Sequence, residues 1–294
     1  MEYQLWKSIV ALLLTLDTSR TPTRFDFSDE DIVKVYYWSV ICDRPVSWAC
    51  HKENWPLQLR KRRLPSPATM SRRLRSPSVV ALLDALERQV TAPKEPHLFW
   101  MIDGKSLPIG GCSKDRQAGY GRAAGCKAKG YKLHALIGSD GCLAEWRLAP
   151  MNKDERVMAK RMIQAAPPEV VGYILADANF DSNQLHQACE TRGNLQLVTP
   201  RRYGPEHGTG HRRQTPGRLR SIALTESPFP AFARQLRTER VEIERQFANL
   251  TNWGGGLTCL PPWVRGHRRV RRWVQAKLLL TRLKINIKAT TYVA

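Results

Sequence analysis

The sequence predicts an α/β or α+β domain over residues 98–290, preceded by a small helical domain over residues 1–92. Three observations support this organisation. Residues 1–92 carry helical periodicity and almost no strand-like segments. The polar, proline-containing stretch 91–97 (TAPKEPH) is typical of a linker. Beyond it, short apolar segments alternate with amphipathic ones, which is the pattern of a sheet covered by helices.

In the N-terminal domain, the clearest helix follows Ser28, since this residue is a good N-cap and acidic residues fill the next turn. A second short helix is predicted within residues 44–56, and a third, short and basic, over residues 69–75. The third helix carries Arg72, Arg73 and Arg75. Two interpretations stay open: a helix-turn-helix-like unit, or an ordinary helical subdomain with a solvated basic face.

In the second domain, apolar segments of four to seven residues are predicted to be strands. They are Leu98–Ile102, Tyr131–Ile137, Leu143–Leu148, Tyr173–Ala176 and Leu195–Thr199. Helical periodicity marks Lys153–Ala165, Ser182–Cys189 and Ala233–Leu250, and a further helix within residues 264–287. Residues 200–230 are rich in Arg, Gly, Pro and His and are expected to form a long basic loop.

The chain is strongly basic. Lys and Arg outnumber Asp and Glu by 47 to 26, which gives a net charge of +21 and a pI near 10.1. Such an excess indicates a polyanionic partner, nucleic acid above all, bound with a steep dependence on salt. The residues expected to contact DNA are Arg72, Arg73, Arg75, Arg201, Arg202, Arg268 and Arg269.

Cysteine usage and hydropathy indicate an intracellular protein. The seven cysteines include no CxxC pair and no zinc-finger spacing with histidine, so they are expected to be reduced thiols. The apolar run IVALLLTL near the start is too short to span a bilayer. No membrane partner is expected, and the cytoplasm is the expected compartment.

Three carboxylates carry the chemistry that the sequence predicts. Asp103 and Asp177 each end an apolar run that reads as a buried strand, where an acidic group is costly without compensation. Asp181 is expected to cap the following helix. Carboxylates gathered from distant positions in a basic chain are the ligands that hold divalent metal for phosphodiester chemistry.

The third acid lies on the helix over 233–250. Its apolar stripe includes Leu236 and Phe247, and both Glu239 and Glu244 fall near the edges of that stripe. Helical geometry therefore leaves two candidates.

Four collinear motifs between residues 99 and 250 resemble the DDE (Asp-Asp-Glu) transposases of bacterial insertion sequences. They are IDGKSLP, GYKLHALIGSDG, LADANFDS and RVEIERQFANL. The last is similar to the family's Arg-x3-Glu-x2-Phe pattern, with Arg240, Glu244 and Phe247 in register, and this resemblance selects Glu244.

The resemblance implies a ribonuclease H-like mixed sheet flanked by helices. It also implies that Asp103, Asp177 and Glu244 bind two Mg²⁺ (or Mn²⁺) ions, cut transposon ends and join them to target DNA. Lys105, Lys132 and Arg240 would then contact phosphate. The resemblance implies double-stranded DNA as a partner, both as terminal inverted repeats and as target. It also implies a homo-oligomer of the chain on DNA. The implied compartment is the bacterial cytoplasm or nucleoid.

Two positions depart from the pattern of some relatives. Arg237 and Thr251 stand where those relatives carry Tyr and Lys. The alternatives are therefore a catalytically impaired DNA-binding protein derived from such an enzyme, or a metal-dependent DNA nuclease.

Overall fold

The computed structural model describes residues 1–16, 27–60, 63–123, 125–203, 208, 213–226, 230–252 and 256–293. Contacts divide the chain into two compact units. One contains Met1–Thr91, Trp253–Gly256 and Arg268–Ala294, and the other contains Ala92–Asn252 and Leu257–His267. In the described residues no helix combines the length and apolar character needed to cross a membrane.

The first unit is helical. It contains α1 (Glu2–Thr15), α2 (Asp29–Ile41), α3 (Val46–Ala49), two 3₁₀ turns (Lys52–Asn54 and Leu57–Leu59), α4 (Pro67–Arg73), α5 (Pro77–Thr91) and most of α10 (His267–Val293). The predicted start of α2 is confirmed, because the Ser28 hydroxyl accepts a hydrogen bond from the Asp31 N–H at 3.1 Å. The amide of Gln275, in α10, donates to Asp84 of α5 at 2.6 Å. By its contacts, most of α10 therefore belongs with the N-terminal helices.

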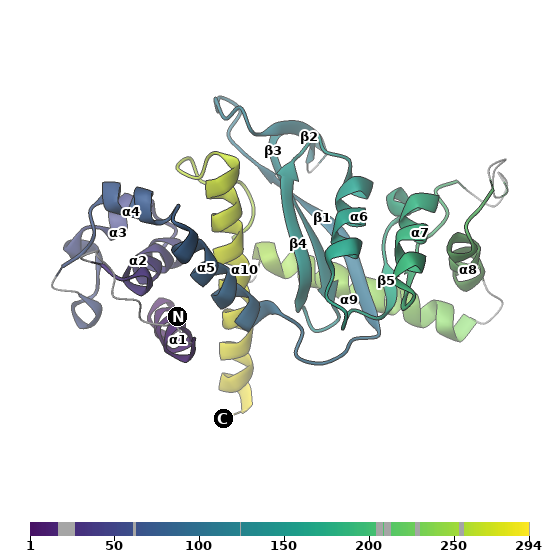
Figure 1. Cartoon of the computed structure of the whole chain (residues 1–294), viewed down its shortest axis with the longest axis horizontal. Coiled ribbons are helices and arrows are strands. Elements are labelled where there is room, and N and C mark those ends of the chain that lie inside the picture. Colours follow the sequence, from purple (N-terminus) through teal and green to yellow (C-terminus); the bar gives the residue numbers. More distant parts are fainter. Residues whose placement is uncertain are drawn as a thin grey trace. The chain divides into compact units, whose positions relative to one another are not determined.

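The second unit is built on one mixed sheet (Figure 1). Its strands are β1 (Phe99–Pro108), β2 (Gly119–Ala123), β3 (Cys126–Gly138), β4 (Leu143–Pro150), β5 (Gly172–Leu175) and β6 (Leu195–Val198). The strand order is β2-β3-β1-β5-β6, with β4 also paired to β3. The central strand β1 runs antiparallel to β3 and parallel to β5.

The helices of this unit are α6 (Glu155–Ala165), the turn η3 (Ala178–Phe180), α7 (Asn183–Arg192), α8 (Pro216–Thr225) and α9 (Pro230–Asn252). Apart from the short β2, three antiparallel strands are followed by helix, strand, helix, strand and helices, as expected for a ribonuclease H-like fold. The predicted mixed sheet flanked by helices is therefore confirmed.

Strand alternation separates the two faces of the sheet. Trp100 and Ile102 of β1 lie in the main core, together with Ala159 of α6 and Leu185 of α7. Phe99 lies on the other face, in a smaller cluster that includes Leu236 of α9. Helices α6 and α7 thus cover one face of the sheet and α9 packs against the opposite one (Figure 1).

The expected loop over residues 200–230 needs correction. Its residues 216–225 form α8, which begins at Thr215, whose hydroxyl accepts the Arg218 N–H at 3.3 Å. The helix buries Ser221, and this hydroxyl contacts the backbone of Thr199. Residues 204–207, 209–212 and 227–229 of the same segment lie outside the described residues. Short helices without a wide apolar stripe give little periodicity, but the Thr-Pro pair is a start signal.

Candidate active site

The two aspartates are placed by the parallel register of β1 and β5. Met101 lies beside Leu175, and each aspartate comes two residues further along its strand direction. Because side chains alternate, two residues further means the same face, here the one that α9 covers. The register therefore places Asp103 and Asp177 side by side, with Asp177 just beyond the end of β5; Asp103 does not end its strand as predicted, because β1 continues to Pro108.

The backbone holds the two carboxylates differently. Asp103 lies inside β1, opposite Ala135 of β3, and one of its oxygens accepts the N–H of Gly104 at 2.6 Å. Asp177 has left β5 and begins η3, where its Oδ1 accepts the N–H of Asn179 at 2.8 Å. Both carboxylates are half-buried, so solvent and ligands reach them.

The pKa of Asp103 is raised, mainly because the carboxyl is partly buried. Burial raises the pKa of Asp103 to about 6; the negative charges of Asp177 and Glu155 add to the rise, while the Gly104 N–H and Lys132 oppose it. The charges of Lys105 and Lys132 near Asp103 do not offset the effect of burial on its carboxyl. A divalent cation bound by hard oxygen ligands would add positive charge there.

Glu155 is an acidic residue that sequence reasoning missed. It is the first residue of α6, and its carboxylate forms an ion pair with the Lys132 ammonium from β3. The signal was present, because Asp154 and Glu155 stand together where a helix begins and where acids are favoured by the helix dipole. Lys132, expected to contact phosphate, is thus held by Glu155 on the protein.

Lys105 shares the face of β1 with Asp103, whereas His134 of β3 lies opposite Gly104, on the other face of the sheet. Burial lowers the pKa of Lys105, while the charge of Asp103 opposes that fall. His134 is fully buried beside Gly104, and burial lowers its pKa to about 4, with Lys132 contributing. His134 is therefore a neutral packing residue.

Glu244 lies on α9, whose Leu236 packs onto the sheet. Its carboxylate is paired with Arg240 one helical turn earlier, at 3.1 Å, and about half of the side chain is exposed. Glu239 is half-buried on the same helix. Within the described part of the chain, Asp103, Asp177 and Glu244 do not bring their ligand oxygens within 4.8 Å of one another. The structure thus brings two of the three predicted acids together.

The predicted DNA-contacting arginines fall into exposed and internal groups. The side chains of Arg72, Arg75, Arg202, Arg268 and Arg269 are exposed. Arg201 forms an ion pair with Glu226. Arg73 is buried, and its guanidinium donates to the Phe27 carbonyl at 2.8 Å and to Asp29 at 2.6 Å. Arg73 therefore stabilises the helical unit from within.

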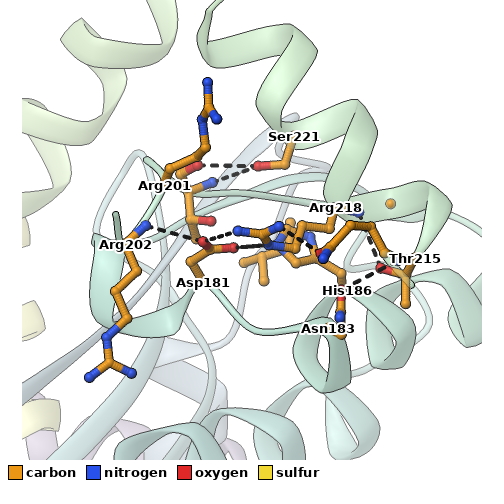
Figure 2. Close-up of polar contacts among 12 residues, drawn as sticks. Asp181, Asn183, His186, Arg201, Arg202, Thr215, Arg218 and Ser221 are labelled. Atoms are coloured by element: carbon orange, nitrogen blue, oxygen red, sulfur yellow. Dashed lines mark hydrogen bonds and ion pairs between the residues drawn. The ribbon is translucent and has the colours of Figure 1, made fainter. Parts of the chain in front are cut away.

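Asp181 has a different role from the predicted helix cap. Ser182 precedes α7 without any side-chain cap, while Asp181 accepts two hydrogen bonds of 2.7 Å from the Arg218 guanidinium (Figure 2). It also accepts the backbone N–H of Arg202 at 3.1 Å, and His186 Nε2 lies 3.5 Å away. The buried carboxylate thus fixes α8 to the start of α7 and the end of β6.

Comparisons with known proteins found a matching protein family and a similar solved structure. The sequence model of the family described as "Transposase DDE domain" matches residues 95–281. A solved structure of a piggyBac transposase synaptic complex with hairpin DNA is similar, with 13% sequence identity, a TM-score of 0.48, and coverage of 97% of this chain and 71% of that one. The comparison with curated proteins gave no match.

Proposed function

This chain belongs to the family of DDE transposases, and from that premise we propose that it mobilises a bacterial insertion sequence. The chain is a DNA transposase, an enzyme of phosphodiester cleavage and transfer. Its proposed substrates are the terminal inverted repeats of its own element and a target duplex. We place the reaction in the bacterial cytoplasm or nucleoid.

Divalent metal ions are the cofactors that DDE transposases generally use. We propose two Mg²⁺ or Mn²⁺ ions, held by Asp103 and Asp177 with Glu244 as the third ligand. The observation that carries the proposal is the β1–β5 register, which sets the two half-buried aspartates side by side. When bound, such ions activate the attacking oxygen and stabilise the leaving oxygen at phosphorus.

The chain's own groups have separate tasks in this scheme. Asp103 is fixed by the strand and by the Gly104 N–H, so its carboxylate is oriented before any ligand binds. Lys105 lies two residues further along β1, on the same face, where its ammonium would meet a DNA phosphate. Lys132 is paired with Glu155 and would instead limit the negative charge around Asp103.

The choice of Glu244 rests on the Arg-x3-Glu-x2-Phe motif. Its ion pair with Arg240 supports the choice, because an arginine beside a ligand carboxylate also offers a donor to phosphate. Exposed arginines of both units would contact the DNA backbone, and two copies of the chain would hold the two ends of the element.

The test uses a duplex that carries the inverted repeats flanking the coding sequence. Wild type should nick this DNA and join the released 3′-hydroxyl to a target only with Mg²⁺ or Mn²⁺. Asp103→Asn, Asp177→Asn and Glu244→Gln should bind the DNA as wild type does yet nick it at least a thousandfold more slowly. Glu239→Gln is the matched control and should keep activity.

Each alternative function has its own outcome. Nicking without joining would identify a metal-dependent nuclease. DNA binding without nicking in wild type would identify an impaired descendant of a transposase. If Glu239→Gln is inactive and Glu244→Gln is active, the third ligand has been assigned to the wrong residue.

A further inference from the structure

A second group of metal-ligating side chains lies away from the aspartates. His97 precedes β1, and Asp140 and Cys142 belong to the turn between β3 and β4. One ligand atom from each of the three lies within 4.8 Å of the others. Gly138 pairs with Trp100, three residues before Asp103, so the group is roughly 10 Å along the strand from that carboxylate.

The imidazole of His97 is oriented by its neighbours. Its ring meets Trp100 edge-on at 5.3 Å between centroids, and its Nδ1 lies 3.4 Å from the Ser139 hydroxyl. A polar partner at Nδ1 is the arrangement that directs Nε2 toward a metal. Among the residues that the structure describes, His97 Nε2 is buried without a hydrogen-bond partner, yet it lies 3.4 Å from Asp140 Oδ1.

A nitrogen lone pair and a carboxylate oxygen repel each other unless a proton or a cation lies between them. Zn²⁺ binds imidazole nitrogen and carboxylate oxygen at about 2.0–2.1 Å, and a tetrahedral angle then separates the two ligand atoms by ~3.4 Å. The observed separation of His97 Nε2 and Asp140 Oδ1, 3.4 Å, equals this distance between two ligand atoms of a tetrahedral zinc site.

The absence of a side chain at Gly138 leaves room for the Cys142 sulfur and the His97 imidazole. A Cβ on Gly138 would stand 2.7 Å from Cys142 Sγ and 3.1 Å from His97 Cδ2, so any larger residue would displace both. The turn itself is tight, because the Cys142 N–H donates to Asp140 Oδ1 at 2.8 Å and the Gly138 N–H donates to the Cys142 carbonyl at 3.0 Å. Glycine is thus required where the two ligands come together.

We propose that His97, Asp140 and Cys142 form a Zn²⁺ site that ties the β3–β4 turn to the segment entering β1. A thiolate, an imidazole and a carboxylate are ligands of zinc, whereas Mg²⁺ prefers oxygen alone. Three protein ligands leave the fourth position to water. The site is independent of the catalytic carboxylates, and its role is to stabilise the end of the sheet at which β1 begins.

The experiment uses the full chain, stripped of metal by a chelator, with Zn²⁺ and Co²⁺ as probes. Wild type should take up one Zn²⁺ per chain in competition with a chromogenic chelator. Co²⁺ should give a thiolate charge-transfer band, and Zn²⁺ should raise the melting temperature. A millimolar excess of Mg²⁺ should leave all three unchanged.

The variants separate this site from other thiols and from the catalytic acids. Cys142→Ser should abolish the cobalt band, and His97→Gln and Asp140→Asn should weaken Zn²⁺ binding tenfold or more. Cys189→Ser removes another buried thiol of the same core and should bind Zn²⁺ as wild type does. Asp177→Asn should also keep wild-type Zn²⁺ binding, whatever its effect on DNA cleavage.

Three outcomes would overturn the proposal. They are a wild type that neither binds nor is stabilised by Zn²⁺, an unchanged cobalt band in Cys142→Ser, and a loss of stability in His97→Gln that is the same with and without Zn²⁺. The last result would show that an imidazole N–H, not a metal, joins His97 to Asp140. None of these outcomes bears on DNA cleavage by the aspartates.

Discussion

Replacing Asp181 by Asn tests whether the buried ion pair holds the region between the second aspartate and α9. The Asp181 side chain is 3% exposed and that of Arg218 is 13% exposed. Asn keeps the shape of Asp but removes the charge, and its amide group has only one acceptor oxygen to offer Arg218. The guanidinium would then be left inside the protein without its counter-charge.

The expected cost follows from the contacts that are lost. Two hydrogen bonds of 2.7 Å join Arg218 to Asp181, and the Asn oxygen can keep only one of them, without its charge. The lost bond to a charged group contributes about 1.5–3 kcal/mol, and removing one partner of a buried ion pair typically costs about 3–5 kcal/mol in all. For a unit of this size, the melting temperature should fall by about 6–20 °C.

The same pair predicts how stability depends on pH. Burial alone would raise the pKa of Asp181, but the contacts with His186, Arg218 and the Arg202 N–H outweigh it and hold the pKa well below its usual range. A carboxyl with a depressed pKa stabilises the fold above its unfolded pKa of about 3.9, and this stabilisation is lost as the pH falls toward the folded value. Wild type should therefore lose stability below about pH 4 more steeply than Asp181→Asn.

The assay is urea unfolding of the full chain from pH 7 to pH 3, followed by far-ultraviolet circular dichroism. Asp154→Asn is the matched control, since Asp154 pairs with Arg156 at the surface and Asn caps a helix as well as Asp does. An exposed pair is worth at most about 1 kcal/mol. If Asp181→Asn is no less stable than Asp154→Asn, the pair does not hold α8 in place.

Two further predictions compare neighbouring or equivalent residues. Arg73→Ala should lower the free energy of unfolding by about 2 kcal/mol or more, because Asp29 and the Phe27 carbonyl lose their donor. Arg72→Ala should leave stability unchanged and reduce the slope of log affinity for DNA against log salt by about one. The opposite pattern in urea unfolding and salt-dependent binding would contradict the burial of Arg73. Gly130→Ala should lower the free energy of unfolding by about 1–3 kcal/mol, because a Cβ there would stand 2.3 Å from the Leu107 carbonyl oxygen. Gly110→Ala, where a Cβ meets no described atom within 4 Å, should lower it by less than about 0.5 kcal/mol. Equal unfolding midpoints for the two variants would refute this.

The elements that sequence reasoning located are those with a strong apolar signal. Strands β1, β3, β4, β5 and β6 each bury consecutive apolar residues, and each was predicted within a few positions of at least one end. Strand β2 was missed because its sequence, GYGRA, buries only its first and last residues and contains two glycines. Helix α8 was missed because its stability comes from capping and from the Arg218 pair rather than from an apolar stripe.

At the site, Asp103 and Asp177 were found because each follows an apolar run, although Asp103 lies inside β1 and not at its end. Their alignment could not be predicted, since it depends on which strands are neighbours and in which register. The partners of Asp181, Lys132 and Arg73 were equally out of reach, because each lies more than 20 positions away in the sequence and no local pattern encodes it.

The central position of β1 also determines when the site can exist. Asp103 and Asp177 become neighbours only after β5 has paired beside β1, across 74 intervening steps of chain, and long-range parallel pairing of this kind forms late in folding. A growing polypeptide on the ribosome would therefore carry exposed arginines before it carries an assembled pair of carboxylates. If the proposed site is correct, nascent chains could bind nearby DNA before they are able to cut it.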